Sequence, residues 1–294
     1  DTIPDLNDGL ERSIRADMQK ALEYDPENGA FRYIATAHKE GTPPPFTSVT
    51  LPYSGMTVFR TDWTEDAMWA YFESAPFGKA HQHEDKLEIE LYAYRTKLLT
   101  DVGRYDYDRS LMRDFVLSTR AHNTGMVDTF GQNRRKNYEW HPEDLAKKSD
   151  ISWHFGEDYE VSEGTYADGY GPDLIPVTHH RKMIFFKKGI EGTKPFFVLV
   201  DTFTPMDGGE HLYEVHFQLD KEPIAAQGKC VTAKHENGVS LSLISTAYPT
   251  ILIGQYRPRY MGWRQIYAPG TDHEHMPAPA VNFTEYGGEK TVVT

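Results

Sequence analysis

The sequence has only one cysteine, Cys230, which excludes a disulfide within the chain. An oxidising compartment is therefore neither required nor excluded. The sequence also lacks an apolar run approaching the ~20 residues that a membrane span needs. Residues 1–8 are acidic and polar, unlike a secretion signal. We therefore predict no membrane insertion.

Positive charge is scarce, because 31 Lys and Arg residues stand against 44 Asp and Glu residues, a net charge of −13. This balance argues against a broad electrostatic surface for nucleic acid, and we expect no nucleic-acid partner. A polyanionic ligand would need a cleft that is locally basic. The chain also has no internal repeat and no low-complexity tract.

An amphipathic helix is predicted near the start of the chain. Between Leu6 and Tyr24, apolar residues recur every four positions, at Leu6, Leu10, Ile14, Met18 and Leu22. Gly41 and three consecutive prolines, residues 43–45, then indicate a linker or an extended arm. We place a boundary near residue 50, with a helix and linker over residues 1–50 and a second domain over residues 51–294.

Beyond residue 50, short apolar runs alternate with turn residues. Many of these runs are rich in Val, Ile, Phe and Tyr, as half-buried strands are. The runs cover residues 67–75, 87–94, 183–186, 196–200, 239–244 and 251–253. Since helical periodicity is nearly absent here, the fold class that we predict is mainly β, an antiparallel β-sandwich of two packed sheets.

The most informative stretch for chemistry runs from Pro76 to Leu91. On a strand, alternate residues share a face, so His81, His83 and Asp85 would point the same way. Two imidazoles about 7 Å apart along a strand could bind one metal, or one could be a ligand and the other a proton-transfer group. A hydrogen-bonded pair at a sheet edge is the structural alternative.

Two further candidate ligands follow along the chain. Asp101 ends an apolar run just before Gly103, and His122 lies in the segment Ser118–Thr124. A His, an Asp and a second His from three separate elements form a typical ligand set for Zn²⁺, with one position left for water or substrate.

Taken in order, these motifs resemble the C-terminal sheet domain of heparinase II/III-type lyases. The resemblance covers roughly residues 51–220. It is carried by Ser54-Gly55, Phe77-Gly78, His81-Gln82-His83-Glu84-Asp85-Lys86-Leu87, Asp101-Val102-Gly103-Arg104-Tyr105 and Thr119-Arg120-Ala121-His122-Asn123-Thr124.

The resemblance implies a polysaccharide lyase that cleaves uronate-containing acidic polysaccharide by β-elimination. It also implies that the principal catalytic tyrosine belongs to an N-terminal helical toroid domain, of which residues 1–50 would be a remnant. The chain alone is therefore expected to be inactive without that helical domain. The size of such substrates implies a bacterial protein that is periplasmic or secreted.

The resemblance also assigns roles to individual residues. The metal ligands are His83, Asp101 and His122, for Zn²⁺ or else Ca²⁺ or another divalent ion. The catalytic residues are His81 and Tyr105. Apart from the resemblance, a basic run of Arg104, Arg109, Arg113 and Arg120 is a candidate for substrate binding, and we select Arg104, Arg120 and Asn123 as the substrate-binding residues. For the arginines, clamping of uronate or sulfate competes with surface pairing to nearby aspartates.

Two other function classes stay open at this point. His81, His83 and Glu88 imitate the metal motif of cupins, which would make the protein a cupin-type metalloenzyme. On a continuous strand, however, Glu88 would face away from both histidines. The second alternative is a non-catalytic carbohydrate-binding module.

Overall fold

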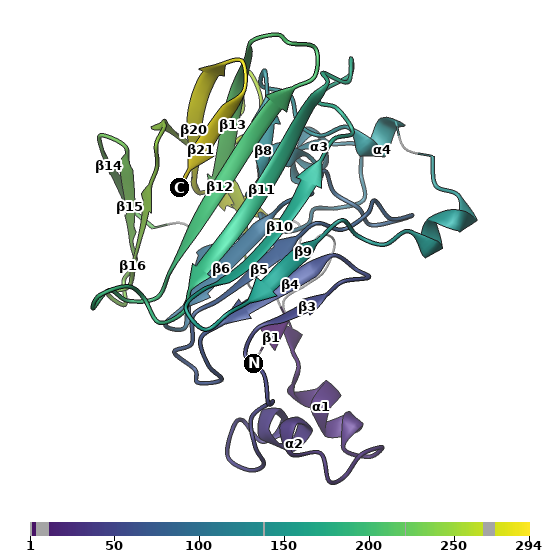
Figure 1. Cartoon of the computed structure of the whole chain (residues 1–294), viewed down its shortest axis with the longest axis vertical. Coiled ribbons are helices and arrows are strands. Elements are labelled where there is room, and N and C mark those ends of the chain that lie inside the picture. Colours follow the sequence, from purple (N-terminus) through teal and green to yellow (C-terminus); the bar gives the residue numbers. More distant parts are fainter. Residues whose placement is uncertain (1, 4–11, 138, 221, 267–273) are drawn as a thin grey trace.

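A computed structural model describes residues 2–3, 12–137, 139–220, 222–266 and 274–294, and these residues form a mainly β structure (Figure 1). The α-helices of the described residues are short: α1 (Arg15–Ala21), α2 (Gly29–Ala35), α3 (Leu111–Val116) and α4 (Arg134–Asn137). Single 3₁₀ turns cover Thr119–Ala121 and Pro142–Ala146. None of the helices in the described ranges is long and apolar enough to cross a membrane.

Three antiparallel sheets form most of the body. The first has the order β3 (Val49–Leu51), β4 (Met56–Arg60), β5 (Trp69–Glu73), β6 (Ile89–Ala93), β7 (Thr96–Leu99). The second has the order β21 (Lys290–Val293), β12 (Phe196–Pro205), β11 (Val177–Phe186), β10 (Glu160–Tyr166), β9 (Ser152–Phe155). The third has the order β17 (Tyr248–Ile253), β20 (Pro279–Gly287), β13 (His211–Gln218), β8 (Gly125–Val127).

Smaller sheets complete the described structure. One joins β14 (Ile224–Gln227), β15 (Cys230–Lys234) and β16 (Ser240–Ile244). Two-stranded pairs are formed by β1 (Thr2–Ile3) with β2 (Arg12–Ser13) and by β18 (Trp263–Gln265) with β19 (His275–Pro277).

The predicted single β-sandwich is wrong. The strands divide among several small antiparallel sheets, arranged like a four-bladed propeller. Alternation and turn residues mark where strands occur, but they do not specify which strands pair. For example, β8 pairs with β13, which follows it by more than 80 residues in the chain. Such long-range pairing is invisible to local periodicity.

The helical region also differs from the prediction. Helix α1 is shorter than the predicted stripe, whose Leu6 and Leu10 lie outside the described residues. A second helix, α2, follows after a short break and was not predicted. Asn28 caps it by accepting hydrogen bonds from the backbone N–H groups of Ala30 and Phe31, both at 3.1 Å. The domain boundary near residue 50 stays a prediction.

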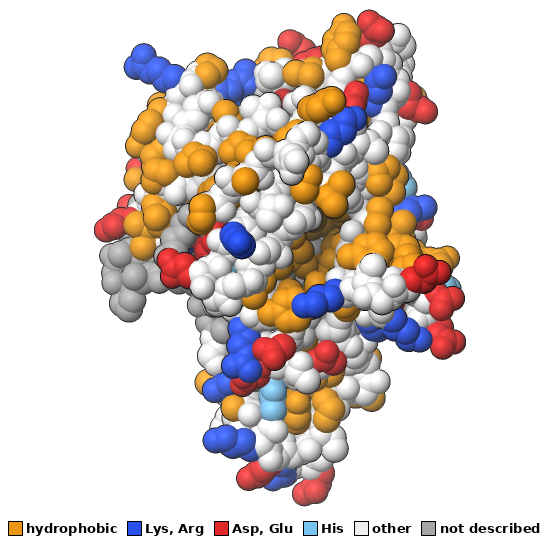
Figure 2. Space-filling view, turned by 90° about the vertical axis from the view of Figure 1, so that its left-hand side faces the viewer, with side chains coloured by type: hydrophobic (Ala, Val, Ile, Leu, Met, Phe, Trp, Pro, Cys, Tyr) orange, Lys and Arg blue, Asp and Glu red, His pale blue; other side chains and the backbone are white. Residues whose placement is uncertain are grey.

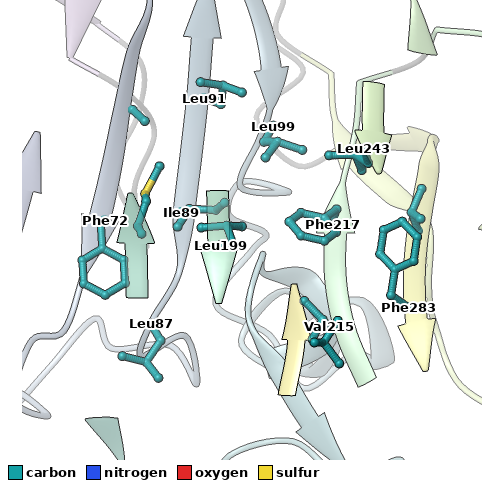
Figure 3. Packing of buried hydrophobic residues seen from close by; sticks show 14 of the residues in the cluster. Phe72, Leu87, Ile89, Leu91, Leu99, Leu199, Val215, Phe217, Leu243 and Phe283 are labelled. Carbon is teal, nitrogen blue, oxygen red and sulfur yellow. The ribbon is translucent and has the colours of Figure 1, made fainter. Parts of the chain in front are cut away.

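A continuous hydrophobic core lies between the sheets (Figure 3). Cross-strand partners Phe185 and Phe197 stack with ring centroids 4.3 Å apart, an arrangement worth about 0.5–1.5 kcal/mol beyond burial. Figure 3 labels Phe72, Leu87, Ile89, Leu91, Leu99, Leu199, Val215, Phe217, Leu243 and Phe283 as members of this core. Because Leu87 and Ile89 belong to it, the core fixes one end of the segment that carries the histidines.

An Asp–His–Asp contact ties three strand ends together. His211, at the start of β13, lies 2.6 Å from Asp128 Oδ2 through Nδ1 and 3.3 Å from Asp207 Oδ1 through Nε2. Partial burial disfavours the charged ring, but the hydrogen bonds to the two aspartates outweigh it and raise the pKa of His211.

Replacing His211 with Gln should therefore destabilise the protein in a pH-dependent way. A raised folded-state pKa gives stabilisation that is complete below the unfolded value of about 6.5 and is lost as pH rises through the folded value. Urea unfolding should show a larger loss at about pH 5.5 than at about pH 8.5. His154→Gln, at an exposed position, is the control, and an equal loss at both pH values in His211→Gln would contradict the assignment.

Candidate active site and metal centre

The segment of residues 77–88, called the histidine loop from here on, connects β5 to β6 and is not a strand. His81 has a φ of 59° and Leu87 a φ of 70°, so the chain bends where the prediction had a continuous strand. The predicted shared face of His81 and His83 is therefore wrong. His81 is exposed, whereas His83 is fully buried.

Three residues of the predicted metal set meet in the interior. His83 Nδ1 lies 3.1 Å from His122 Nε2, and Asp101 Oδ2 lies 3.7 Å from that same nitrogen. All three side chains are fully buried, and their ligand atoms lie within 4.8 Å of one another. Ligands at 2.0–2.1 Å from a tetrahedral Zn²⁺ are separated by roughly 3.4 Å, so the spacing and the N₂O donor set fit zinc.

The environment of His122 prepares its Nε2 to be a ligand. Its Nδ1 lies 2.9 Å from the carbonyl oxygen of Ser118, which can only accept, so Nδ1 carries the proton. Nε2 then carries the lone pair of the ring and lies beside His83 Nδ1 and Asp101 Oδ2. Burial lowers the pKa of His122 to about 4, although Asp85 opposes the shift, and the ring is neutral at pH 7.

Buried carboxylates surround this centre. Asp85, Glu88 and His122 form a second group with metal-ligand spacing, and Oδ2 of Asp85 has no hydrogen-bond partner among the described residues. Burial and then Asp101 raise the pKa of Glu88 well above its ordinary value. Burial and then Asp85 raise the pKa of Glu73 to about 8. A bound cation would favour the ionised form of these acids and so lower their pKa values.

His81 lies at the rim of a shallow depression of about 360 Å³. Its Nδ1 is 3.1 Å from the hydroxyl of Tyr107, whose ring lies 4.7 Å below the guanidinium of Arg113. The lining is formed by residues 77–82, Tyr107, Arg113, Leu117 and Arg135. Sequence reasoning missed Tyr107, because only the turn after Asp101 brings it to the histidine loop.

Tyr105, the tyrosine predicted to be catalytic, does not contact His81. Its ring packs edge-on against His275 at 5.5 Å and joins a small apolar cluster around Val102 and Phe115. The two tyrosines are two residues apart in the sequence, yet the structure brings only Tyr107 to His81. A catalytic role for Tyr105 stays a prediction.

The three predicted substrate-binding residues lie in different settings. Asn123 is fully buried, and its amide bonds the carbonyls of Ile89 and Thr100 and the N–H of Gln218. Its side chain therefore joins strands and is not open to a ligand in this structure. Arg120 and Arg104 are half-buried and do not line the depression at His81. Burial and then Arg259 lower the pKa of Arg120 to about 10.

The histidine loop is held by its backbone and by one acid. Glu84 accepts hydrogen bonds from the N–H groups of Arg134 and Arg135 at the start of α4, at 2.9 and 2.6 Å. Gln132 bonds both the N–H and the carbonyl of Lys86. These contacts fix the loop before any ligand is bound, which is the preorganisation that a catalytic group needs.

Arg181 anchors the other end of the loop. Its guanidinium is fully buried, bonds the carbonyl of Leu87 at 2.8 Å and that of Asn123, and forms an ion pair of 2.6 Å with Asp201. His179 bonds the same carboxylate oxygen at 2.7 Å. Burial favours the neutral acid, but Arg181 and His179 outweigh it and lower the pKa of Asp201. Through these hydrogen bonds, the second sheet holds the segments that carry His83 and His122 in place.

The ligand set that would define a cupin is not assembled. Among the described residues, His81, His83 and Glu88 do not form a group with metal-ligand spacing. His83 instead combines with Asp101 and His122, which come from the end of β7 and from the segment before β8.

Comparison with known proteins identifies the family. The family model described as "Heparinase II/III-like, C-terminal" matches residues 43–270. The chain therefore belongs to this family.

The curated relatives are longer proteins. The chain is 28% identical over 205 residues to a heparin-sulfate lyase of Pedobacter heparinus, covering 68% of this chain and 28% of that protein. It is 25% identical over 226 residues to a heparin-sulfate lyase of Bacteroides stercoris, covering 74% and 30%. The chain thus spans less than a third of the length of these relatives.

A solved structure shows the same fold. The heparan sulfate lyase HepC of Pedobacter heparinus superposes with a TM-score of 0.77 at 21% identity, over 99% of this chain and 42% of that one. The match shows the fold alone, and it includes the N-terminal helices as well as the sheets.

Replacing Arg181 with Leu should lower the free energy of unfolding by about 3–5 kcal/mol, because Asp201 would be left as a buried charge without its partner. Urea unfolding measures the change. The neighbouring Lys182→Leu, which removes a partly exposed pair with Glu163, should cost less than about 1 kcal/mol. The double variant Arg181→Leu/Asp201→Leu should regain part of the loss. If Arg181→Leu and Lys182→Leu lowered the free energy of unfolding equally, the role of Arg181 would be contradicted.

Proposed function

We propose that this chain is the sheet portion of a polysaccharide lyase that acts on an acidic glycosaminoglycan such as heparan sulfate. The observation that carries the proposal is the placement of two histidines of one rigid loop. His83 lies buried against Asp101 and His122, and His81 lies exposed at a depression that also holds Arg113 and Arg135. The relatives named heparin-sulfate lyases support this substrate class.

The proposed reaction is β-elimination. A base removes the C5 proton of a uronate, the electron pair forms a C4–C5 double bond, and the C4–O bond breaks. The leaving oxygen takes a proton, and an unsaturated uronate remains. His81 is the proton-transfer group of this half, since it is exposed and hydrogen-bonded to Tyr107. Arg113 and Arg135 provide positive charge that neutralises the carboxylate and so acidifies C5.

The metal that we propose is Zn²⁺, held by His83, Asp101 and His122. When bound, it supplies positive charge among the buried carboxylates. His83 is two residues from His81, so holding His83 also holds the backbone that presents His81 to the depression. The chain's own residues carry out the proton transfer, and the buried centre positions them.

The remaining parts of the enzyme come from outside this chain. Because the chain spans less than a third of its curated relatives, we propose that a helical toroid domain completes the cleft and supplies the principal catalytic tyrosine. We further propose that the protein works in the bacterial periplasm or outside the cell, where polymers of this size occur.

The reaction itself is tested by mixing the complete enzyme, this chain together with its helical domain, with glycosaminoglycans, alginate and other uronans. Absorbance of the unsaturated uronate should rise with a glycosaminoglycan. No rise with any polymer, from a protein whose fold is verified by circular dichroism, would refute the proposed function.

The role of His81 is tested in the same assay. His81→Ala should reduce the elimination rate by at least about 100-fold, because general acid–base groups contribute 10²–10⁴-fold. Tyr107→Phe, which removes only the hydroxyl next to His81, should lower kcat more than it changes KM. Tyr105→Phe changes the tyrosine that the resemblance assigned as catalytic. We expect this variant to retain most of the activity, because Tyr107 is the tyrosine that contacts His81. If Tyr105→Phe lost as much activity as Tyr107→Phe, the assignment of Tyr107 as the partner of His81 in catalysis would be wrong.

The metal centre is tested on the 294-residue chain without any substrate. His83→Ala should reduce zinc content from about one per chain to near zero and lower Tm, because metal binding contributes folding free energy. Elemental analysis and thermal unfolding measure both. His81→Ala should keep the metal and the Tm. Zinc that stays bound in His83→Ala would exclude His83 as a ligand.

A further inference from the structure

Four side chains form a row across the first sheet, called the cation–aromatic row from here on: Arg60, Trp69, Tyr92 and Lys97. Arg60 of β4 is paired with Trp69 of β5, Trp69 with Tyr92 of β6, and Tyr92 with Lys97 of β7. Directly paired residues of neighbouring antiparallel strands project to the same face. The row therefore presents two cations and two aromatic rings on one surface of the sheet.

The row is packed as a ladder. The rings of Trp69 and Tyr92 stack with centroids 4.3 Å apart and planes inclined by 7°. Lys97 Nζ lies 5.4 Å from the centroid of Tyr92, and the guanidinium of Arg60 lies 5.9 Å from Trp69 and 4.4 Å from Trp63. Since ring faces are occupied within the ladder, the rings offer their edges, which carry partial positive charge.

The row borders a cavity of about 590 Å³ between the sheet and the N-terminal helices. Ile34 of α2 and Arg15 of α1 line its other side. Figure 1 shows the two helices beside the end of the first sheet, and in Figure 2 side chains of both charge signs gather over this junction.

The lining is basic in a chain whose net charge is −13. Its charged side chains are Arg15, Arg60, Arg95, Lys97 and the single acid Glu65. Arg95 is paired with Glu65 at 3.0 Å and with Asp66 at 2.8 Å. Among the described residues Arg60 forms no direct ion pair. Burial lowers the pKa of its guanidinium, and the charge of Asp62 opposes this shift. Arg60 is thus a half-buried cation that borders the cavity.

The cavity is separate from the depression at His81. Strand β5 begins at Trp69 in the row and ends at Glu73, which leads to the histidine loop. Likewise, β7 begins beside the row and leads to Asp101. The strands thus place the two sites at opposite ends of the sheet, at least about 13 Å apart at 3.3 Å per residue.

We propose that this cavity is a second, non-catalytic binding site for an acidic saccharide, with Arg60 and Lys97 binding a carboxylate or sulfate group. A guanidinium matches the planar geometry of both groups, and the ammonium of Lys97 adds a second charge across the ring ladder. The saccharide class rests on the proposed function, whereas the anion site rests on the cavity alone. The site would hold a polymer at a distance from the reacting bond.

The test is a titration of the ¹⁵N-labelled 294-residue chain with a sized heparan sulfate oligosaccharide, followed by its tryptophan indole signals. The signals of Trp63 and Trp69 should shift, and that of the buried Trp263 should not. Arg60→Gln/Lys97→Gln should raise the Kd of this transition at least about tenfold. Lys229→Gln/Lys234→Gln, which removes the same charge from exposed positions of another sheet, should leave the Kd unchanged.

Additional controls test whether a free anion or the saccharide is bound, and whether the variants are folded. Arg60→Lys keeps the charge and should give an intermediate Kd, with circular dichroism and Tm verifying the fold. Sodium sulfate at equal concentration, and a neutral oligosaccharide, should cause no comparable shift. Equal Kd values in the row and control variants would overturn the proposal, as would sulfate alone binding as tightly as the oligosaccharide. This titration measures binding only. A failure of the proposed elimination reaction would be seen in the separate absorbance assay.

Discussion

The buried guanidinium of Arg181 is the contact on which the candidate site depends. It belongs to the second sheet, yet its hydrogen bonds go to the carbonyls of Leu87 and Asn123, next to His83 and His122 in the chain. Asp201 balances its charge from the neighbouring strand. Because all of these groups are excluded from water, none can shift without leaving a polar group unpaired. The sheets and the histidine segments are thus locked into one arrangement.

The sequence was informative where chemistry is carried by residue type. A pair of histidines, an aspartate and a further histidine indicated a metal site, and the family resemblance selected His83, Asp101 and His122, which the fold brings together. The mainly β character also followed from short apolar runs. The sheet arrangement did not, because the pairing of β8 with the distant β13 depends on contacts far apart in the chain.

Local backbone geometry also could not be predicted from the sequence. The positive φ of His81 reverses the side-chain direction that alternation assigns, and no pattern in residues 76–91 indicates that bend. Tyr107 and Tyr105 are equally plausible partners of His81 on spacing alone, and only the turn of the backbone selects Tyr107. By contrast, helix α2 had a readable signal in Asn28, a favoured capping residue.

In the histidine loop, the residues that hold the loop in place differ from those that are exposed at the depression. Glu84 and Leu87 hold it in place, while Lys79, Ala80 and His81 are exposed at the depression. Substitutions at positions 79 and 80 therefore alter the surface of the depression without touching the buried centre. A scaffold of this kind can diverge in substrate preference during evolution at little cost in folding, because the residues free to vary are not those that hold the loop.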